Sequence, residues 1–329
     1  MKTLLSILAL VAASFAPATA YSQAKLRFAH GYEVSEPFHT SAVWAAGEIA
    51  RRTGNRYQID VFPASQLGKE ADVNQGLTLG TVDMILTGSA FIGRTFPPAS
   101  IGGAPFIFRD FDHYRKYSSS PLFAELAAGY QKASGGNTIV ATTYFGTRHV
   151  TSNKPIRKPE DMRGLKIRVP DAPLYLLFPR AMGANATPIA FSEVYMALQT
   201  KTVDAQENPL PTIDAKKFYE VQSHISMTGH IIEALFTVVS GSRWNSMTEA
   251  DRTVFSAVLR EAAERATAEI IESERKLGAE FAAKGKTIVP VDTAAFIDVL
   301  QKVYRDGRHP DGSSLPWSKD IFNRLQSIK

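Results

Sequence analysis

The sequence contains no cysteine. This absence excludes disulfide bonds, thiol nucleophiles and thiolate metal sites together. It also excludes a lipid-modified N-terminal cysteine, so we do not expect a lipoprotein tethered to a membrane.

Long hydrophobic runs are missing after the first twenty residues, so no transmembrane helix is predicted there. The beginning of the chain has the pattern of a secretory signal peptide. Lys2 supplies the positive end, Leu4 to Ala13 the apolar stretch, and Ala18 to Ala20 the small-residue cleavage site. We expect the mature chain to start at Tyr21, with cleavage after Ala24 as the alternative. An exported protein without an anchor needs a closed compartment, which indicates the periplasm of a Gram-negative cell.

Dense basic segments are also missing. The formal net charge is +5, but lysine and arginine are dispersed, and no basic run is interleaved with aromatic residues. Nucleic-acid binding usually requires such a run, so we expect no nucleic-acid partner. The apolar fraction of 44% is typical of a globular protein with a substantial core.

Common catalytic motifs are absent as well. The chain has no Gly-x-Ser-x-Gly segment and no His-Glu-x-x-His segment. Its histidines, among them His30, His39 and His149, show no metal-ligand spacing. We therefore expect no enzymatic activity, no metal and no cofactor. A periplasmic enzyme acting on sugar acids is the alternative, and turnover of a bound acid would support it.

Strand and helix patterns alternate along the chain, which predicts an α/β protein. Removing twenty residues from 329 leaves 309, a length typical of two domains. One long helical pattern runs from Glu249 to Lys284, with Thr248 and Asp251 as a capping pair at its start. Strands are predicted at residues 26–30, 57–62, 83–87, 138–145, 165–169 and 203–206.

Several segments resemble one family. They are Gly146-Thr-Arg148, Gly164-Leu-Lys-Ile-Arg-Val-Pro170, Gln206-Glu-Asn-Pro209, Pro105-Phe-Ile-Phe-Arg-Asp110 and Ser65-Gln-Leu-Gly68, together with the run from Phe191 to Gln222. These segments resemble the DctP-type solute-binding proteins of TRAP transporters, and the similarity covers nearly the whole chain after the predicted signal peptide. These are periplasmic receptors that deliver organic acids to a sodium-coupled membrane carrier.

The resemblance implies a two-lobed periplasmic binding protein fold with a hinge and a long helix that bridges both lobes. Residues 1–20 would be the signal peptide. The first lobe would comprise residues 21–145 and about 234–273, and the second residues 146–233 and about 274–329. The expected partners are a small carboxylate ligand and the small and large TRAP membrane subunits, and the receptor is expected to be monomeric.

Arg168 is the first candidate for holding a carboxylate, because a bidentate guanidinium best replaces the water that a carboxylate loses on binding. It ends a predicted strand, and ligands bind at that end of open α/β sheets. It also resembles the arginine that grips the carboxylate in this family, and Arg148 resembles the family's second arginine. Asn208 can both donate and accept hydrogen bonds to a neighbouring hydroxyl or keto group. Glu207 either contacts the ligand or pairs with an arginine.

The remaining candidates are assigned from their positions. Asp171 could accept a ligand hydroxyl or orient a guanidinium, and Phe191 could form an apolar wall or belong to the core. The first lobe offers acceptor-rich side chains at strand ends and a helix start, which favours a polyhydroxylated ligand. These candidates are His30, Glu33, Glu70, Asn74, Gln75 and Ser89.

Gly88 and Phe91 bear on the identity of the ligand. In the sialic-acid branch of the family, an acid and an arginine occupy these positions, so this chain is not expected to bind sialic acid. Other segments, including Glu36-Pro-Phe-His-Thr40, resemble members that bind hexuronates. Glucuronate or galacturonate is therefore the predicted ligand. An aromatic oxo-acid, another organic acid, and a sensory rather than a transport role are the alternatives.

Overall fold

A computed structural model describes residues 23–329, so the predicted signal peptide lies outside the described residues. A single mixed sheet runs through the molecule in the order β2-β1-β3-β8-β4-β7-β5-β6, and β9 pairs with β8. The predicted α/β class is confirmed. The strands are β1 (Ala24–Ala29), β2 (Tyr57–Phe62), β3 (Met84–Gly88), β4 (Thr138–Ser152), β5 (Lys166–Val169), β6 (Asn185–Pro188), β7 (Ala205–Pro209), β8 (His224–Val239) and β9 (Thr287–Val289).

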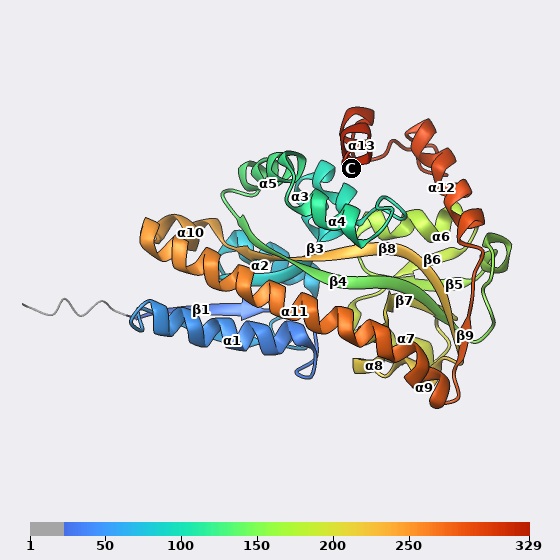
Figure 1. Ribbon diagram of the computed structural model, residues 1–329, viewed down its shortest axis with the longest axis horizontal. Helices are drawn as coiled ribbons and strands as arrows, with labels where there is room; N and C mark the ends of the chain where they lie inside the picture. Colours follow the sequence, from blue (N-terminus) through green and yellow to red (C-terminus); the bar gives the residue numbers. More distant parts are fainter. Residues whose placement is uncertain (1–22) are drawn as a thin grey trace, which may run out of the picture.

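Helices cover both faces of this sheet (Figure 1). Within residues 23–329, no helix combines the length and the apolar character needed to cross a membrane. The α-helices are α1 (Pro37–Arg52), α2 (Glu70–Leu79), α3 (Ser89–Thr95), α4 (Phe111–Ser118), α5 (Pro121–Ala133), α6 (Leu177–Ala181), α7 (Val194–Gln199), α8 (Leu210–Ala215), α9 (Phe218–Val221), α10 (Gly241–Ser246), α11 (Glu249–Ala283), α12 (Thr293–Asp306) and α13 (Lys319–Gln326). The 3-10 helices are η1 (Pro97–Gly103), η2 (Pro159–Met162), η3 (Pro173–Leu176) and η4 (Phe191–Glu193).

The long antiparallel strands β4 and β8 join the two halves of the molecule (Figure 1). The end of β8 pairs with β3 on one side, while the end of β4 pairs with β7 on the other. Their ladder is interrupted by register shifts, one of them between Tyr144 and Gly146. Gly146 has a φ of 130°, and a Cβ there would lie 2.6 Å from Cβ of Pro209. Only glycine fits this conformation and this close approach.

The predicted boundary between the lobes, at residues 145 and 146, falls at this bulge, and it stays a prediction because both strands continue through it. The end of the chain departs from the predicted division. His113 of α4 approaches the carbonyl oxygen of Leu325 at 3.1 Å, and Arg324 of α13 pairs with Glu125 of α5 at 2.5 Å. The last helix therefore lies against the first half of the molecule, because its buried face contacts α4 and α5.

Helix α11 runs along strands β4 and β8 and connects two apolar clusters (Figure 1). Phe255, near its start, belongs to the larger buried cluster, and Phe281, near its end, belongs to the smaller one. The helix has 35 residues, a length of about 52 Å at 1.5 Å per residue. The predicted cap is confirmed, because the Thr248 side chain accepts a hydrogen bond from the backbone N–H of Asp251.

The predicted strands and the long helix occur near their expected places, with two differences that affect the site. The strand expected at residues 138–145 is β4, which continues to Ser152, so Arg148 lies within it. The strand expected at residues 203–206 is β7, which spans Ala205–Pro209. Glu207 and Asn208 therefore lie within a buried strand rather than just beyond its end. The reason is their pairing with β4, where His149 faces Asn208 and Val150 faces Glu207.

Replacing Phe281 tests whether α11 holds the smaller cluster in place. The side chain is fully buried, so Phe281→Ala should lower the free energy of unfolding by about 3–5 kcal/mol. Arg275→Ala on the exposed face of the same helix should change it by less than about 0.5 kcal/mol. Urea unfolding followed by circular dichroism measures both, and equal effects would contradict this role of α11.

Candidate functional site

A cavity lies between the two halves of the molecule, beside strands β4 and β8. The empty space within it is about 660 Å³ when the open mouth is included. Of the residues that the sequence nominates, those lining it are Glu70, Arg148, Arg168, Asp171, Phe191 and Asn208. Polar residues that the sequence did not nominate line it too, namely Tyr32, Ser65, Lys69, Tyr175 and Glu233.

Arg168 ends β5, and its side chain is 1% exposed. Its Nε and Nη2 atoms both donate to the carbonyl oxygen of Ile189, at 2.9 and 2.7 Å. Its Nη1 atom is buried and has no hydrogen-bond partner among the described residues. Burial lowers the pKa of Arg168 to about 10, so the guanidinium stays charged at neutral pH. The carbonyl fixes one edge of the guanidinium and leaves the other with an unused donor.

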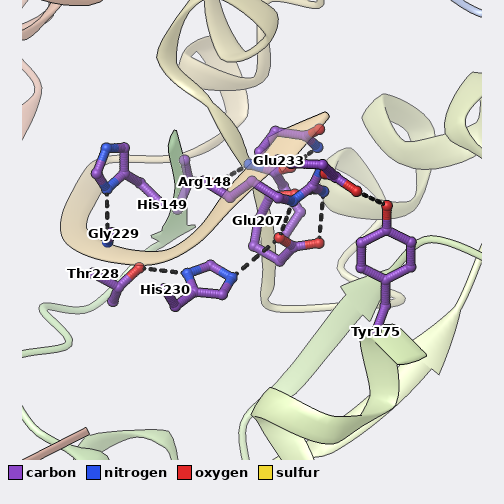
Figure 2. Close-up of polar contacts among 11 residues, drawn as sticks. Arg148, His149, Tyr175, Glu207, Thr228, Gly229, His230 and Glu233 are labelled. Atoms are coloured by element: carbon purple, nitrogen blue, oxygen red, sulfur yellow. Dashed lines mark hydrogen bonds and ion pairs between the residues drawn. The ribbon is translucent and has the colours of Figure 1, made fainter. Parts of the chain in front are cut away.

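Arg148 lies in β4 and is bound on every side, as Figure 2 shows. Its Nε and Nη2 atoms donate to the Glu207 carboxylate at 2.5 and 2.7 Å, and Nη2 also donates to the Glu207 carbonyl oxygen at 2.8 Å. Its Nη1 atom donates to Oε2 of Glu233 at 2.6 Å. Two carboxylates therefore pair with one buried guanidinium, so the buried charge of Arg148 is fully compensated within the protein.

His230 supports Glu207 from the side away from Arg148 (Figure 2). Its Nε2 atom lies 3.2 Å from Oε2 of Glu207, and its Nδ1 atom lies 2.8 Å from Oγ1 of Thr228. Its ring stacks on Phe178 with 4.1 Å between centroids. Burial opposes ionisation of Glu207, but Arg148 and His230 hold its pKa at about 2. Glu207 therefore remains charged, and its role here is to orient Arg148, since it does not line the cavity.

Glu233 and Tyr175 complete the network around Arg148 (Figure 2). The Tyr175 hydroxyl donates to Oε1 of Glu233, and both side chains line the cavity. Burial raises the pKa of Glu233, although Arg148 opposes this shift. A signal was present in the sequence, because Glu233 is the one charged residue in the apolar run from Ile231 to Val239. Tyr175 carries no comparable signal.

Glu70 begins α2 on the opposite wall of the cavity. Its Oε1 atom accepts hydrogen bonds from the backbone N–H of Gly88 at 3.0 Å and from the Thr87 hydroxyl at 2.8 Å. Asn74 donates to the same hydroxyl at 2.9 Å and thereby holds it in place without lining the cavity. Burial raises the pKa of Glu70 to about 7, so its carboxyl group can donate or accept a hydrogen bond near neutral pH.

Phe191 and Asp171 lie on the cavity wall of the second half. Two cations lie near the Phe191 ring, with Cζ of Arg168 at 6.0 Å and Nζ of Lys216 at 4.9 Å from its centroid. Asp171 is 3.8 Å from Arg94 of the first half. Asn208 donates to Oε1 of Gln206 at 2.6 Å and lines the cavity floor beside Arg148.

The structure does not bring several nominated residues to the cavity. His30 is buried behind Tyr32, and its Nε2 atom lies 3.2 Å from Nδ1 of His39. Gln75 is exposed, because it lies on the outer side of α2. Ser89 is buried against Gly103, where a Cβ would lie 2.3 Å from its hydroxyl oxygen. Proximity to a strand end does not decide which way these side chains point.

Contacts at the mouth of the cavity connect its two walls. Glu33, a nominated residue that does not line the cavity, pairs with Lys216 at 2.5 Å. Lys69 pairs with Glu193 at 2.6 Å. The Thr212 hydroxyl donates to Oε1 of the buried Glu36 at 3.0 Å. Among residues 23–329, no group of three histidine, aspartate or glutamate side chains is placed to hold a metal ion.

Comparisons with known proteins agree on one family. The model of the family described as "Bacterial extracellular solute-binding protein, family 7", or DctP, matches residues 28–309. The chain is similar to the sialic acid-binding periplasmic protein of Vibrio cholerae, with 32% identity over 306 residues that cover 93% of this chain and 95% of that protein.

Solved structures of TRAP periplasmic solute-binding proteins share the fold. The protein from Polaromonas sp. JS666 with bound D-erythronate has a TM-score of 0.86 and 29% identity, over 93% of this chain and 99% of that chain. The protein from Roseobacter denitrificans with bound L-galactonate has a TM-score of 0.85 and 30% identity, over the same shares of both chains. The predicted two-lobed periplasmic binding protein fold is thereby confirmed.

The buried carboxyl group of Glu36 should make stability depend on pH. Burial raises its pKa from 4.5 to about 7, although hydrogen bonds from Glu33 and Thr212 oppose the shift. Between these pH values the folded chain keeps a proton that the unfolded chain releases, so stability falls as the pH rises. Relative to Glu36→Gln, the wild type should lose on the order of 3 kcal/mol across this window, as measured by urea unfolding. The exposed Glu269→Gln is the control, and parallel profiles for wild type and Glu36→Gln would contradict this assignment.

Proposed function

Because this chain belongs to the DctP family of TRAP solute-binding proteins, we propose that it is a periplasmic receptor for a monocarboxylate sugar acid. The receptor would capture the acid by closing its two lobes and would deliver it to the small and large subunits of a TRAP membrane carrier. The proposed role is binding and delivery without catalysis, in keeping with a family of solute-binding proteins.

The observation that carries this proposal is the unused donor of Arg168. A buried N–H group of a charged side chain without a partner is costly, so such groups normally have one. A ligand carboxylate would supply it with a charge-assisted hydrogen bond. The Ile189 carbonyl already holds the other edge of the guanidinium, so the donor has a fixed direction before the ligand arrives.

The charges around the cavity favour a single carboxylate. Arg148 is neutralised by Glu207 and Glu233, and Lys69 pairs with Glu193. These pairs leave Arg168 as the cation available to an anionic group. A ligand with one carboxylate matches this charge, and its hydroxyl groups would meet the oxygen atoms of Glu70 and the amide of Asn208.

Glucuronate and galacturonate are the first candidate ligands, with other sugar acids next. Similar proteins are described as binding sialic acid, D-erythronate and L-galactonate, which are carboxylates that carry hydroxyl groups. Gly88 and Phe91 lack the polar groups that the sialic-acid branch carries at these positions, which argues against sialic acid here. A sensory role would use the same site, and a signalling partner instead of a carrier would distinguish it.

Replacing Arg168 tests the carboxylate contact. Arg168→Met retains an unbranched side chain but removes the buried charge. Because the cost of burying that charge is also removed, the free energy of unfolding should change by less than about 2 kcal/mol. It should weaken binding of the sugar acid by at least about 100-fold, measured by titration calorimetry. Arg94→Ala, at the exposed pair with Asp171, is the matched control and should retain binding within about threefold. Normal binding by a folded Arg168→Met protein would contradict the proposal.

A thermal-shift screen tests the ligand class. A ligand at about a hundred times its dissociation constant stabilises the folded state by roughly 2.7 kcal/mol, an increase in Tm of about 5 °C for this chain. Glucuronate, galacturonate or an aldonate should produce this shift. Sialic acid and aromatic oxo-acids should not. A shift with aromatic oxo-acids alone would contradict the polyhydroxylated class.

A further inference from the structure

Glu233 is a charged group at the cavity that has no assigned role toward the ligand. It belongs to β8 and is 1% exposed. Its Oε2 atom accepts from Arg148, and its Oε1 atom accepts from the Tyr175 hydroxyl. A carboxylate offers about four acceptor positions, so these two bonds leave capacity on both oxygen atoms. Arg148 and Tyr175 thus fix the carboxylate while it remains able to accept from a ligand.

Gly88 keeps this carboxylate accessible. A Cβ at Gly88 would lie 3.1 Å from the Tyr175 hydroxyl oxygen and 3.2 Å from Oε1 of Glu233. Any side chain here would therefore cover the polar pair. The φ of Gly88 is −78°, an angle that every residue adopts, so the backbone does not require glycine. The missing side chain leaves space beside Glu233 in the cavity wall.

A second carboxyl group, that of Glu70, also contacts Gly88. Oε1 of Glu70 accepts from the backbone N–H of Gly88 at 3.0 Å. The carboxyl groups of Glu70 and Glu233 therefore both lie next to Gly88, and both residues line the cavity. Oxygen acceptors of this kind suit hydroxyl donors, whereas a second ligand carboxylate beside the Glu233 carboxylate would meet like charge.

We propose that Glu233, fixed by Arg148 and Tyr175 and left uncovered at Gly88, is a specificity-determining residue that accepts a hydrogen bond from a ligand hydroxyl. Together with Glu70 it makes the cavity select polyhydroxylated monocarboxylates against dicarboxylates of the same carbon skeleton. This inference rests on the proposed function. It adds a second contact to the ligand, in which Glu233 recognises a hydroxyl group while Arg168 recognises the carboxylate. Tyr175 is a positioning residue in this arrangement.

The test compares two acids that differ at one carbon. Galactonate ends in a hydroxymethyl group where galactarate carries a second carboxylate, and gluconate and glucarate form a second such comparison. We measure dissociation constants by titration calorimetry for whichever pair contains an acid that binds. In the wild type, the dissociation constant of the dicarboxylate should be about 100-fold larger than that of the monocarboxylate. Glu233→Gln keeps the shape of the side chain but removes its charge, and it should reduce this ratio to about tenfold or less. The exposed Glu269→Gln should leave the ratio unchanged.

A second variant retains every side chain that contacts Arg148. Gly88→Ala places a methyl group over Glu233 and Tyr175, and it should weaken galactonate and glucuronate by about tenfold or more without lowering Tm by more than about 2 °C. Unchanged affinity in Gly88→Ala, or an unchanged selectivity ratio in a folded Glu233→Gln protein, would overturn the inference alone. Binding of no acid by the wild type would overturn the proposed function as well.

Discussion

The buried ion pairs of Arg148 determine how the cavity is charged. Removing a guanidinium from water is costly, and removing one partner of such a pair typically costs about 3–5 kcal/mol. Here Glu207 of β7 and Glu233 of β8 hold Arg148 between them at 2.5 and 2.6 Å. Since β4, β7 and β8 are neighbours in the sheet, these pairs also join the strands that connect the two halves. Because Arg148 is satisfied within the protein, the proposed carboxylate contact is left to Arg168, whose Nη1 atom has no partner among the described residues.

Contacts between strand β4 and helix α11 hold Arg148 and its partners in place. Glu274 of α11 accepts from the backbone N–H of Thr147 at 2.7 Å and from the Tyr144 hydroxyl at 2.8 Å. These bonds fix β4 on both sides of the bulge at Gly146, immediately before Arg148. The long helix therefore supports the site directly as well as filling the core. A movement of the two halves that alters this bulge would alter the setting of Arg148 with it.

Much of the fold could be predicted because its signals are local. Alternating residues such as Tyr57 to Phe62 predict a strand, and Thr248 with Asp251 marks the start of α11. Arg168 and Arg148 could be nominated because their surrounding segments resemble a family. Which side chains reach the cavity depends on packing between distant segments, so Gln75 and Ser89 were nominated although they do not line it, and Tyr175 was missed. Glu233 stood in an apolar strand, which was a readable sign of a buried, partnered carboxylate.

In the proposed complex, Arg168 holds the ligand carboxylate while Arg148 remains occupied by Glu207 and Glu233. A crystal structure of the mature protein with bound glucuronate, or with the sugar acid that gives the largest thermal shift, would locate the carboxylate. We expect a carboxylate oxygen about 2.7–2.9 Å from Nη1 of Arg168, with both ion pairs of Arg148 retained. A carboxylate that instead displaces Glu233 from Arg148, or binds at Lys69 without contacting Arg168, would contradict this proposal.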